Sequence, residues 1–294
     1  MARRMSALAR AGSAVSGWWF KPMPLARVAV LRTLVYLFLI FDMLYVATDV
    51  VPHGYVPELY QPTLVARILQ LPTLGVTGGQ VLFWVVTLAS VCAAIGAFQR
   101  AAGWVAGLGF WLWMLNSQGF SYVSHDHMAL MVAVLVLPTV GVARFGDTGS
   151  SERVGWVLRV VQVFTILTYF GSAISKWTRS GTPWVWANGA VFVWAIMRRG
   201  SDLIRWTLDF PWLLIVGQWA LLLLEFCSPV VLFLRGKWLY ALVATFVLFH
   251  LATYLALGIH FLPTVVCWAA FLPLERIPAW LRRRIGRRSE VAPA

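Results

Sequence analysis

The sequence predicts an all-α, polytopic membrane protein with about eight transmembrane helices, and three observations support this. Hydrophobic residues make up 60% of the 294 residues and charged residues only 12%, about half the charged share of an average soluble protein. Eight apolar stretches approach or reach the length needed to cross the hydrocarbon of a bilayer. Basic residues gather at the chain ends and in short loops, a pattern typical of the cytoplasmic side of membrane proteins.

The predicted spans follow one another along the whole chain, each close to the length of a membrane-crossing helix. They cover residues 28–47, 80–98, 101–115, 128–142, 155–176, 211–234, 238–257 and 261–274. The last two are joined by only Gly258, Ile259 and His260, so the alternative is that they are not separate spans. The apolar run 190–197 is too short to cross, and we expect it to be re-entrant or interfacial.

The charge distribution predicts three parts with both chain termini in the cytoplasm. Residues 1–25 form a basic segment, 26–277 the transmembrane domain and 278–294 a basic tail. The loop after the fifth predicted span carries four arginines on the side expected to be outside, Arg179, Arg198, Arg199 and Arg205. Two alternatives would explain them: a six-span topology, or local amphipathic packing of this loop.

The net charge of +13 is explained by this topology, and we expect membrane lipid rather than nucleic acid as the partner of the basic residues. Only three basic residues are lysines, Lys21, Lys176 and Lys237. The arginine bias favours a bacterial protein, and the location expected is the inner (plasma) membrane with several passes. The cysteines are widely spaced without a CxxC motif, so neither a disulfide framework nor a zinc site is indicated.

Ionisable residues at membrane depth are costly and usually face a cavity or a partner. Lys176 ends the fifth predicted span. Two interpretations remain open: a lysine whose ammonium reaches the membrane interface, or a desolvated neutral amine that acts as base or nucleophile. Glu225 lies nearer the middle of its span, where an interhelical hydrogen bond or pairing with Arg159 or Arg32 is expected.

The segment 124–127 reads Ser-His-Asp-His immediately before the fourth predicted span. Ser124 or Asp126 is a candidate helix N-cap, and one histidine is a candidate proton carrier in a cavity. A metal site would need further ligands, so no metal is expected. Arg32 and Asp42 lie ten residues apart on one predicted helix, and we expect both to be structural.

Several segments together resemble the horizontally transferred transmembrane (HTTM) family, which includes the membrane part of vitamin K-dependent gamma-carboxylase and many bacterial relatives. The resemblance covers about residues 25–275, and the block from Tyr169 to Gly189 is its most specific part. The matching segments are 31–34 with Asp42, 124–127, 169–176, 184–190, Leu224 and Glu225 with Pro229, Phe249 and His250, and His260 and Phe261.

The resemblance implies a vitamin K-dependent carboxylase-like activity at a non-cytoplasmic cavity. Lys176 would be the base that deprotonates a quinol, reduced vitamin K or menaquinone, and His125 would manage a proton. Oxygen then adds, and epoxidation- or carboxylation-type chemistry follows. The substrate-binding residues implied are Tyr169, His250, Trp184 and Glu225.

We expect no counterpart of the large lumenal domain that follows the membrane part of the carboxylase, and therefore no carboxylation of a peptide by this chain alone. The alternative function is a non-enzymatic membrane factor for maturation or export of a peptide, acting with a partner protein. A transporter is a weaker alternative because no pair of broken helices in two matching halves is recognisable.

Overall fold

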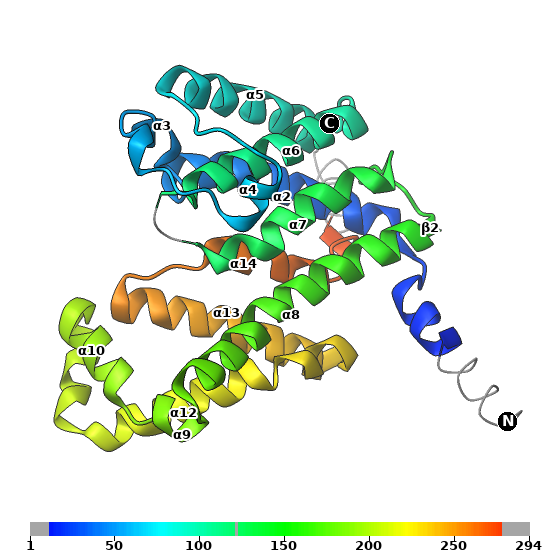
Figure 1. Ribbon diagram of the computed structural model, residues 1–294. Coiled ribbons are helices and arrows are strands. Elements are labelled where there is room, and N and C mark those ends of the chain that lie inside the picture. The colour runs from blue at the N-terminus through cyan, green and yellow to red at the C-terminus, as the bar shows by residue number, and fades with distance from the viewer. Residues whose placement is uncertain (1–11, 121–122, 278–294) are drawn as a thin grey trace, which may run out of the picture. The chain divides into compact units, whose positions relative to one another are not determined.

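A computed structural model describes residues 12–120 and 123–277 (Figure 1). These residues are mostly helical with almost no strand, which confirms the all-α part of the prediction. The strands among them are two residues each, β1 (Met23–Pro24) and β2 (Ser150–Ser151), paired antiparallel with Met23 opposite Ser151. The predicted basic tail 278–294 and residues 1–11 of the predicted basic segment lie outside the described residues.

The chain divides into two units. Unit 1 comprises Met1–Val161 and Leu272–Ala294, and unit 2 comprises Gln162–Phe271. The longest helix, α8 (Glu152–Ser180), begins in unit 1 and ends in unit 2.

Unit 1 is built around the helix α5, which packs against both α2 and α6. Besides the helical residues 12–19 and the start of α8, its α-helices are α2 (Leu25–Tyr45), α3 (Val50–His53), α4 (Leu64–Ile68), α5 (Val76–Ile95), α6 (Gln99–Ser117) and α7 (Met128–Val136). Three short 3₁₀ helices accompany them: η1 (Pro57–Leu59), η2 (His125–His127) and η3 (Leu137–Val140).

Two glycines explain how α5, α6 and α7 come close together. Gly96 ends α5 in the left-handed conformation with φ of 85°, which a glycine adopts without steric cost. A Cβ atom at Gly107 of α6 would lie only 2.6 Å from the carbonyl oxygen of Val134 on α7. Glycine at this position therefore permits the close contact between α6 and α7.

Unit 2 holds residues 162–180 of α8 and a set of helices of very different lengths. Its α-helices are α9 (Pro183–Trp186), α10 (Ala190–Arg199), α11 (Asp202–Arg205), α12 (Pro211–Phe226), α13 (Gly236–Leu257) and α14 (Leu262–Cys267). Its 3₁₀ helices are η4 (Trp206–Asp209), η5 (Ser228–Phe233) and η6 (Trp268–Phe271). Helix α10 packs against α12 and α13, and α11 packs against α13.

Four described helices, α2, α5, α8 and α13, are long and apolar enough to cross a membrane. A fifth span results if the segment Asp202–Asp209 and α12, which meet at a bend of 115°, count as one. The fourth and eighth predicted spans are helical but short, covering His125–Val140 and Leu262–Phe271. Helices able to span a membrane are therefore confirmed, whereas eight spans and cytoplasmic termini stay predictions.

Candidate functional site

Two of the predicted site residues, Lys176 and Glu225, meet in unit 2. Lys176 lies on α8 and Glu225 on α12, and the Nζ atom of Lys176 donates to Oε2 of Glu225. The two side chains are 21% and 9% exposed, so the ion pair is largely shielded from solvent.

The partner found for Glu225 differs from the arginines expected in the sequence. Arg32 and Arg159 belong to unit 1. There Arg32 donates from Nη2 to the carbonyl oxygen of Ala143 at 2.9 Å. Arg159 lies over the ring of Trp18, 4.3 Å from its centroid. The pairing with Lys176 arises because α8 and α12 bring these two side chains together in the fold.

One face of α8 supplies the predicted lysine and its neighbours. Tyr169, Ser172 and Lys176 are spaced by three and four residues, so they share a helix face. The hydroxyl of Ser172 donates to Oε1 of Glu225 at 3.5 Å. Glu225 thus receives Lys176 on one carboxylate oxygen and Ser172 on the other.

Trp186 contacts both Lys176 and Gln218, and Gln218 was not among the residues predicted from the sequence. The Nζ atom of Lys176 lies 4.9 Å from the ring centroid of Trp186, within the range of a cation–π contact. Gln218 is fully buried on α12, and its Nε2 donates to the Trp186 carbonyl oxygen at 2.7 Å. Gln218 precedes Glu225 by seven residues, a spacing that marks one helix face and could have revealed it.

The second amide atom of Gln218 gives the site an open hydrogen-bonding position. Within the described part of the chain, Oε1 of Gln218 is buried and has no hydrogen-bond partner. A buried polar atom without a partner is energetically costly, and such atoms are few in folded proteins. Gln218 is 0% exposed and does not line the small cavity near Trp184, so a ligand hydroxyl can donate to Oε1 only after the side chains that cover it move.

Tyr169 and His250, two more predicted site residues, also meet in unit 2. The hydroxyl of Tyr169 lies 2.5 Å from Nε2 of His250, and Nε1 of Trp268 donates to it at 2.9 Å. Since the Tyr169 oxygen accepts from Trp268, its own hydrogen is available to His250, which assigns His250 Nε2 as an acceptor. All three residues are at least 94% buried, so they form a polar link within the core of unit 2.

Trp184, the remaining predicted binding residue in unit 2, is mostly exposed at the surface. It is 68% exposed, and its ring contacts that of Trp219 with centroids 5.5 Å apart. It lines a cavity of about 160 Å³ together with Ala173, Trp177, Pro183, Trp219, Leu222, Leu223 and Phe226. This small aromatic cavity is built partly from α8 and α12, the helices that carry Lys176 and Glu225.

The segment 124–127 forms a separate polar cluster in unit 1, and its buried histidine is His127, whereas His125 is exposed. Nε2 of His127 lies 3.1 and 3.2 Å from the two carboxylate oxygens of Asp42. Nδ1 of His127 lies 2.8 Å from the hydroxyl oxygen of Ser124, which donates its hydrogen to Asp126. Both ring nitrogens therefore face acceptors, the arrangement expected of a protonated imidazolium.

The structure corrects the helix-cap expectation for this segment and identifies the partner of Asp42. The Ser124 hydroxyl bonds to Asp126 and His127 side chains, and as the residue before η2 it makes no side-chain cap to the backbone. Asp42, expected to be structural, is the buried partner of His127. Among the described residues, no group of three or more His, Cys, Asp or Glu side chains is arranged to hold a metal ion.

The predicted site residues thus fall into two groups. Lys176, Glu225, Tyr169, His250 and Trp184 belong to unit 2, and His125 belongs to unit 1. The HTTM resemblance rests on the sequence motifs alone, because neither family models, nor curated proteins, nor solved structures match this chain.

Proposed function

We propose that unit 2 removes a proton from a hydroxyl compound dissolved in the membrane, with Lys176 as the base and a quinol as that compound. The observation that supports this most is the setting of Lys176. Its Nζ atom is paired with Glu225 and lies over Trp186, while Gln218, which binds the Trp186 backbone, keeps a buried acceptor atom open.

A lysine acts as a base only after its own proton has left. Glu225 is the group that can take this proton, because its Oε2 atom already accepts the hydrogen bond from Lys176. In apolar surroundings a neutral amine next to a protonated carboxyl avoids the desolvation cost of two charges. Lys176 Nζ then accepts the hydroxyl proton of the ligand, and Glu225 holds the proton that Lys176 released.

The residues around the pair suit an aromatic alcohol such as reduced vitamin K or menaquinone. Gln218 Oε1 can accept a hydrogen bond from a ligand hydroxyl once the side chains that cover it move, and the tryptophans near α8 offer flat apolar surfaces. A quinol supplies the reducing equivalents that, with dioxygen, yield a quinone epoxide and water. The resemblance assigns proton handling to His125 as well, and that role belongs to the same proposal.

The decisive experiment uses the full chain in nanodiscs, supplied with reduced menaquinone or vitamin K hydroquinone and oxygen, with mass spectrometry to detect quinone epoxide. Lys176→Arg is the key variant because arginine keeps the positive charge beside Glu225 but stays protonated. Lys237→Arg is the matched control: Lys237 is exposed, and its Nζ lies 5.4 Å from the ring centroid of Trp238.

We expect epoxide from the wild type and from Lys237→Arg, and at least about a hundredfold less from Lys176→Arg, the scale of a lost general base. His125→Ala tests the second proton-handling residue in the same assay. Equal epoxide from Lys176→Arg and the wild type would remove Lys176 from the role of base. No epoxide and no quinol binding by the wild type would favour the alternative, a non-enzymatic factor that matures or exports a peptide with a partner protein.

A further inference from the structure

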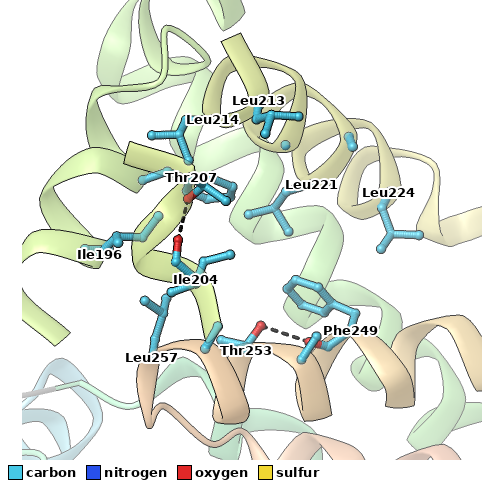
Figure 2. Close-up of a pocket in the computed structure, with 16 residues that line it drawn as sticks. Ile196, Ile204, Thr207, Leu213, Leu214, Leu221, Leu224, Phe249, Thr253 and Leu257 are labelled. Carbon is cyan, nitrogen blue, oxygen red and sulfur yellow. Dashed lines mark hydrogen bonds between the residues drawn. The ribbon is translucent and has the colours of Figure 1, made fainter. Parts of the chain in front are cut away.

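Unit 2 contains a larger cavity whose lining does not include the Lys176–Glu225 pair. Its volume is about 380 Å³, within the usual range of small-molecule sites. Figure 2 shows its walls, which come from α10, the segment 202–209, α12 and α13. Its lining residues are Phe192, Ala195, Ile196, Ile204, Thr207, Leu213, Leu214, Gly217, Ala220, Leu221, Leu224, Phe249, Ala252, Thr253, Ala256 and Leu257.

The walls offer a ligand almost no hydrogen bonds. The polar side chains among these lining residues are Thr207 and Thr253. The Thr207 hydroxyl donates to the Ile204 carbonyl oxygen at 2.6 Å, and Thr253 donates to that of Phe249 at 2.9 Å (Figure 2). Both hydroxyls are thus bonded within their own helical segments. An occupant with polar groups would lose its bonds to water here, whereas a hydrocarbon chain would lose none.

The same segments that line the cavity also carry arginines. Arg198 and Arg199 end α10, two and three residues after the lining residue Ile196, and Arg205 directly follows the lining residue Ile204. All three arginines are exposed. The acidic residues of this stretch are Asp202 and Asp209, so arginine exceeds acid by one charge. Arginine is well suited to bind phosphate because its planar guanidinium donates several hydrogen bonds.

The outer surface of this stretch is apolar and aromatic, as expected at a lipid interface. Trp194, Met197, Leu203 and Trp206 are 61%, 69%, 68% and 54% exposed. Arg198 lies over the ring of Trp194, 5.2 Å from its centroid. Tryptophan beside arginine on a short, non-spanning helix is typical of segments that lie in the headgroup region. This agrees with the expectation that 190–197 is re-entrant or interfacial.

We propose that this cavity binds the acyl chain of an anionic glycerophospholipid, whose phosphate is held by the arginines of α10 and α11. The apolar walls select the hydrocarbon chain and the arginines select the charge of the headgroup. An empty apolar space of this size would leave its lining atoms without contacts on one side, and an acyl chain supplies those contacts. The bound lipid requires none of the chemistry proposed for Lys176.

The test is native mass spectrometry of the purified full chain in detergent, titrated with palmitoyl-oleoyl phosphatidylglycerol or the phosphatidylcholine of the same chains. Ala252→Phe fills the cavity from α13. Ala244→Phe is its control: it makes the same change at an exposed position of α13 that does not line the cavity. Two double variants test the arginines, and each removes two positive charges. The test variant is Arg198→Gln with Arg199→Gln, and its control is Arg235→Gln with Lys237→Gln. All four residues are exposed.

We expect the wild type to retain phosphatidylglycerol in preference to phosphatidylcholine, by about fivefold for each arginine engaged. Ala252→Phe should lose both lipids while Ala244→Phe keeps them. The double arginine variant should keep lipid binding but lose the headgroup preference, which its control retains. The proposal is overturned if Ala252→Phe binds lipid as the wild type does, or if both charge variants change the preference equally.

Circular dichroism and elution profiles identify any variant that fails to fold, and Ala220→Phe on α12 then replaces Ala252→Phe.

Discussion

The two units of the chain bury charge in different ways. In unit 1, the ring of His127 is buried between the carboxylates of Asp42 and Asp126, with its side chain 4% exposed. In unit 2 the cation is Lys176, 21% exposed and paired with Glu225. Histidine is short and its ring is held from both sides. Lysine has a long flexible side chain, and that of Lys176 remains partly exposed at the protein surface.

The two clusters also differ in whether their polar atoms all have hydrogen-bond partners within the protein. We call a cluster closed when they do and open when they do not. Both ring nitrogens of His127 already face protein acceptors, so the cluster suits a structural role. The Lys176 site combines a partly exposed cation with the buried, unpartnered Oε1 of Gln218, as far as the described residues extend. A polar cluster that leaves an acceptor open is the better candidate for binding a ligand.

The largest expected effect is the loss of stability in Asp42→Asn. Asp42 is fully buried, and the substitution keeps its shape but removes the charge that balances His127. Asp126 still lies near Nδ1 of His127, but Nε2 loses the carboxylate that faces it. Removing one partner of a buried ion pair costs about 3 kcal/mol or more. Thermal or detergent-induced unfolding of the purified protein measures this change.

Asp209→Asn is the control for Asp42→Asn, because Asp209 is exposed and should cost less than about 0.5 kcal/mol. If Asp42→Asn unfolds at the same temperature as Asp209→Asn, the cluster in unit 1 does not stabilise the fold.

A smaller effect is expected from Glu225→Gln, the corresponding change in unit 2. Glutamine still accepts a hydrogen bond, and the flexible Lys176 side chain can turn its ammonium toward water. The expected cost is about 1 to 2 kcal/mol, measured by the same unfolding assay with the exposed Glu58→Gln as control. A cost equal to or above that of Asp42→Asn would show that the Lys176 cluster is as closed as the His127 cluster.

The smallest effect is expected at a more exposed ion pair of unit 1. Glu275 accepts from Nε and Nη2 of Arg27 at 2.7 and 2.8 Å, and the side chains of Arg27 and Glu275 are 19% and 24% exposed. Burial alone would raise the pKa of Glu275, but the hydrogen bonds and charge of Arg27 outweigh it and lower this pKa below its ordinary value.

Because the folded state lowers the pKa of Glu275, the ion pair stabilises the protein above the ordinary glutamate pKa and loses this effect as the pH falls through the lowered value. Between about pH 5 and about pH 3 the wild type should therefore lose up to about 1 kcal/mol more than Glu275→Gln, since solvent screens the pair. Unfolding curves of both proteins across this range measure the difference, and parallel curves would show that the pair contributes nothing.

Much of the helical architecture follows from the sequence. Each of the eight predicted spans corresponds to a helical stretch, because runs of apolar residues can satisfy their backbone in a membrane only as helices. The lengths of the stretches at His125–Val140 and Leu262–Phe271 were less predictable. Their termini depend on 3₁₀ turns and on packing, which hydropathy does not encode.

The sequence predicted which residues belong to the candidate site, but it did not predict which of them contact one another. Lys176, Glu225, Tyr169 and His250 are recognisable as polar residues in apolar helices, where each needs a partner. Arg159 and Arg32 were equally plausible partners for Glu225 in the sequence, since helical periodicity defines a face but not the helix that it meets. Gln218 was overlooked because a glutamine is not ionisable, although its spacing from Glu225 marks the same face.

The sequence by itself determined that this chain is helical, apolar enough to enter a membrane, and provided with a few polar residues inside its helices. The tertiary structure decided which of these residues meet: Lys176 with Glu225, Tyr169 with His250, and His127 rather than His125 with Asp42. The physical reason is that hydrophobicity depends on composition along the chain, whereas buried charges and hydrogen-bonding groups must find partners across it.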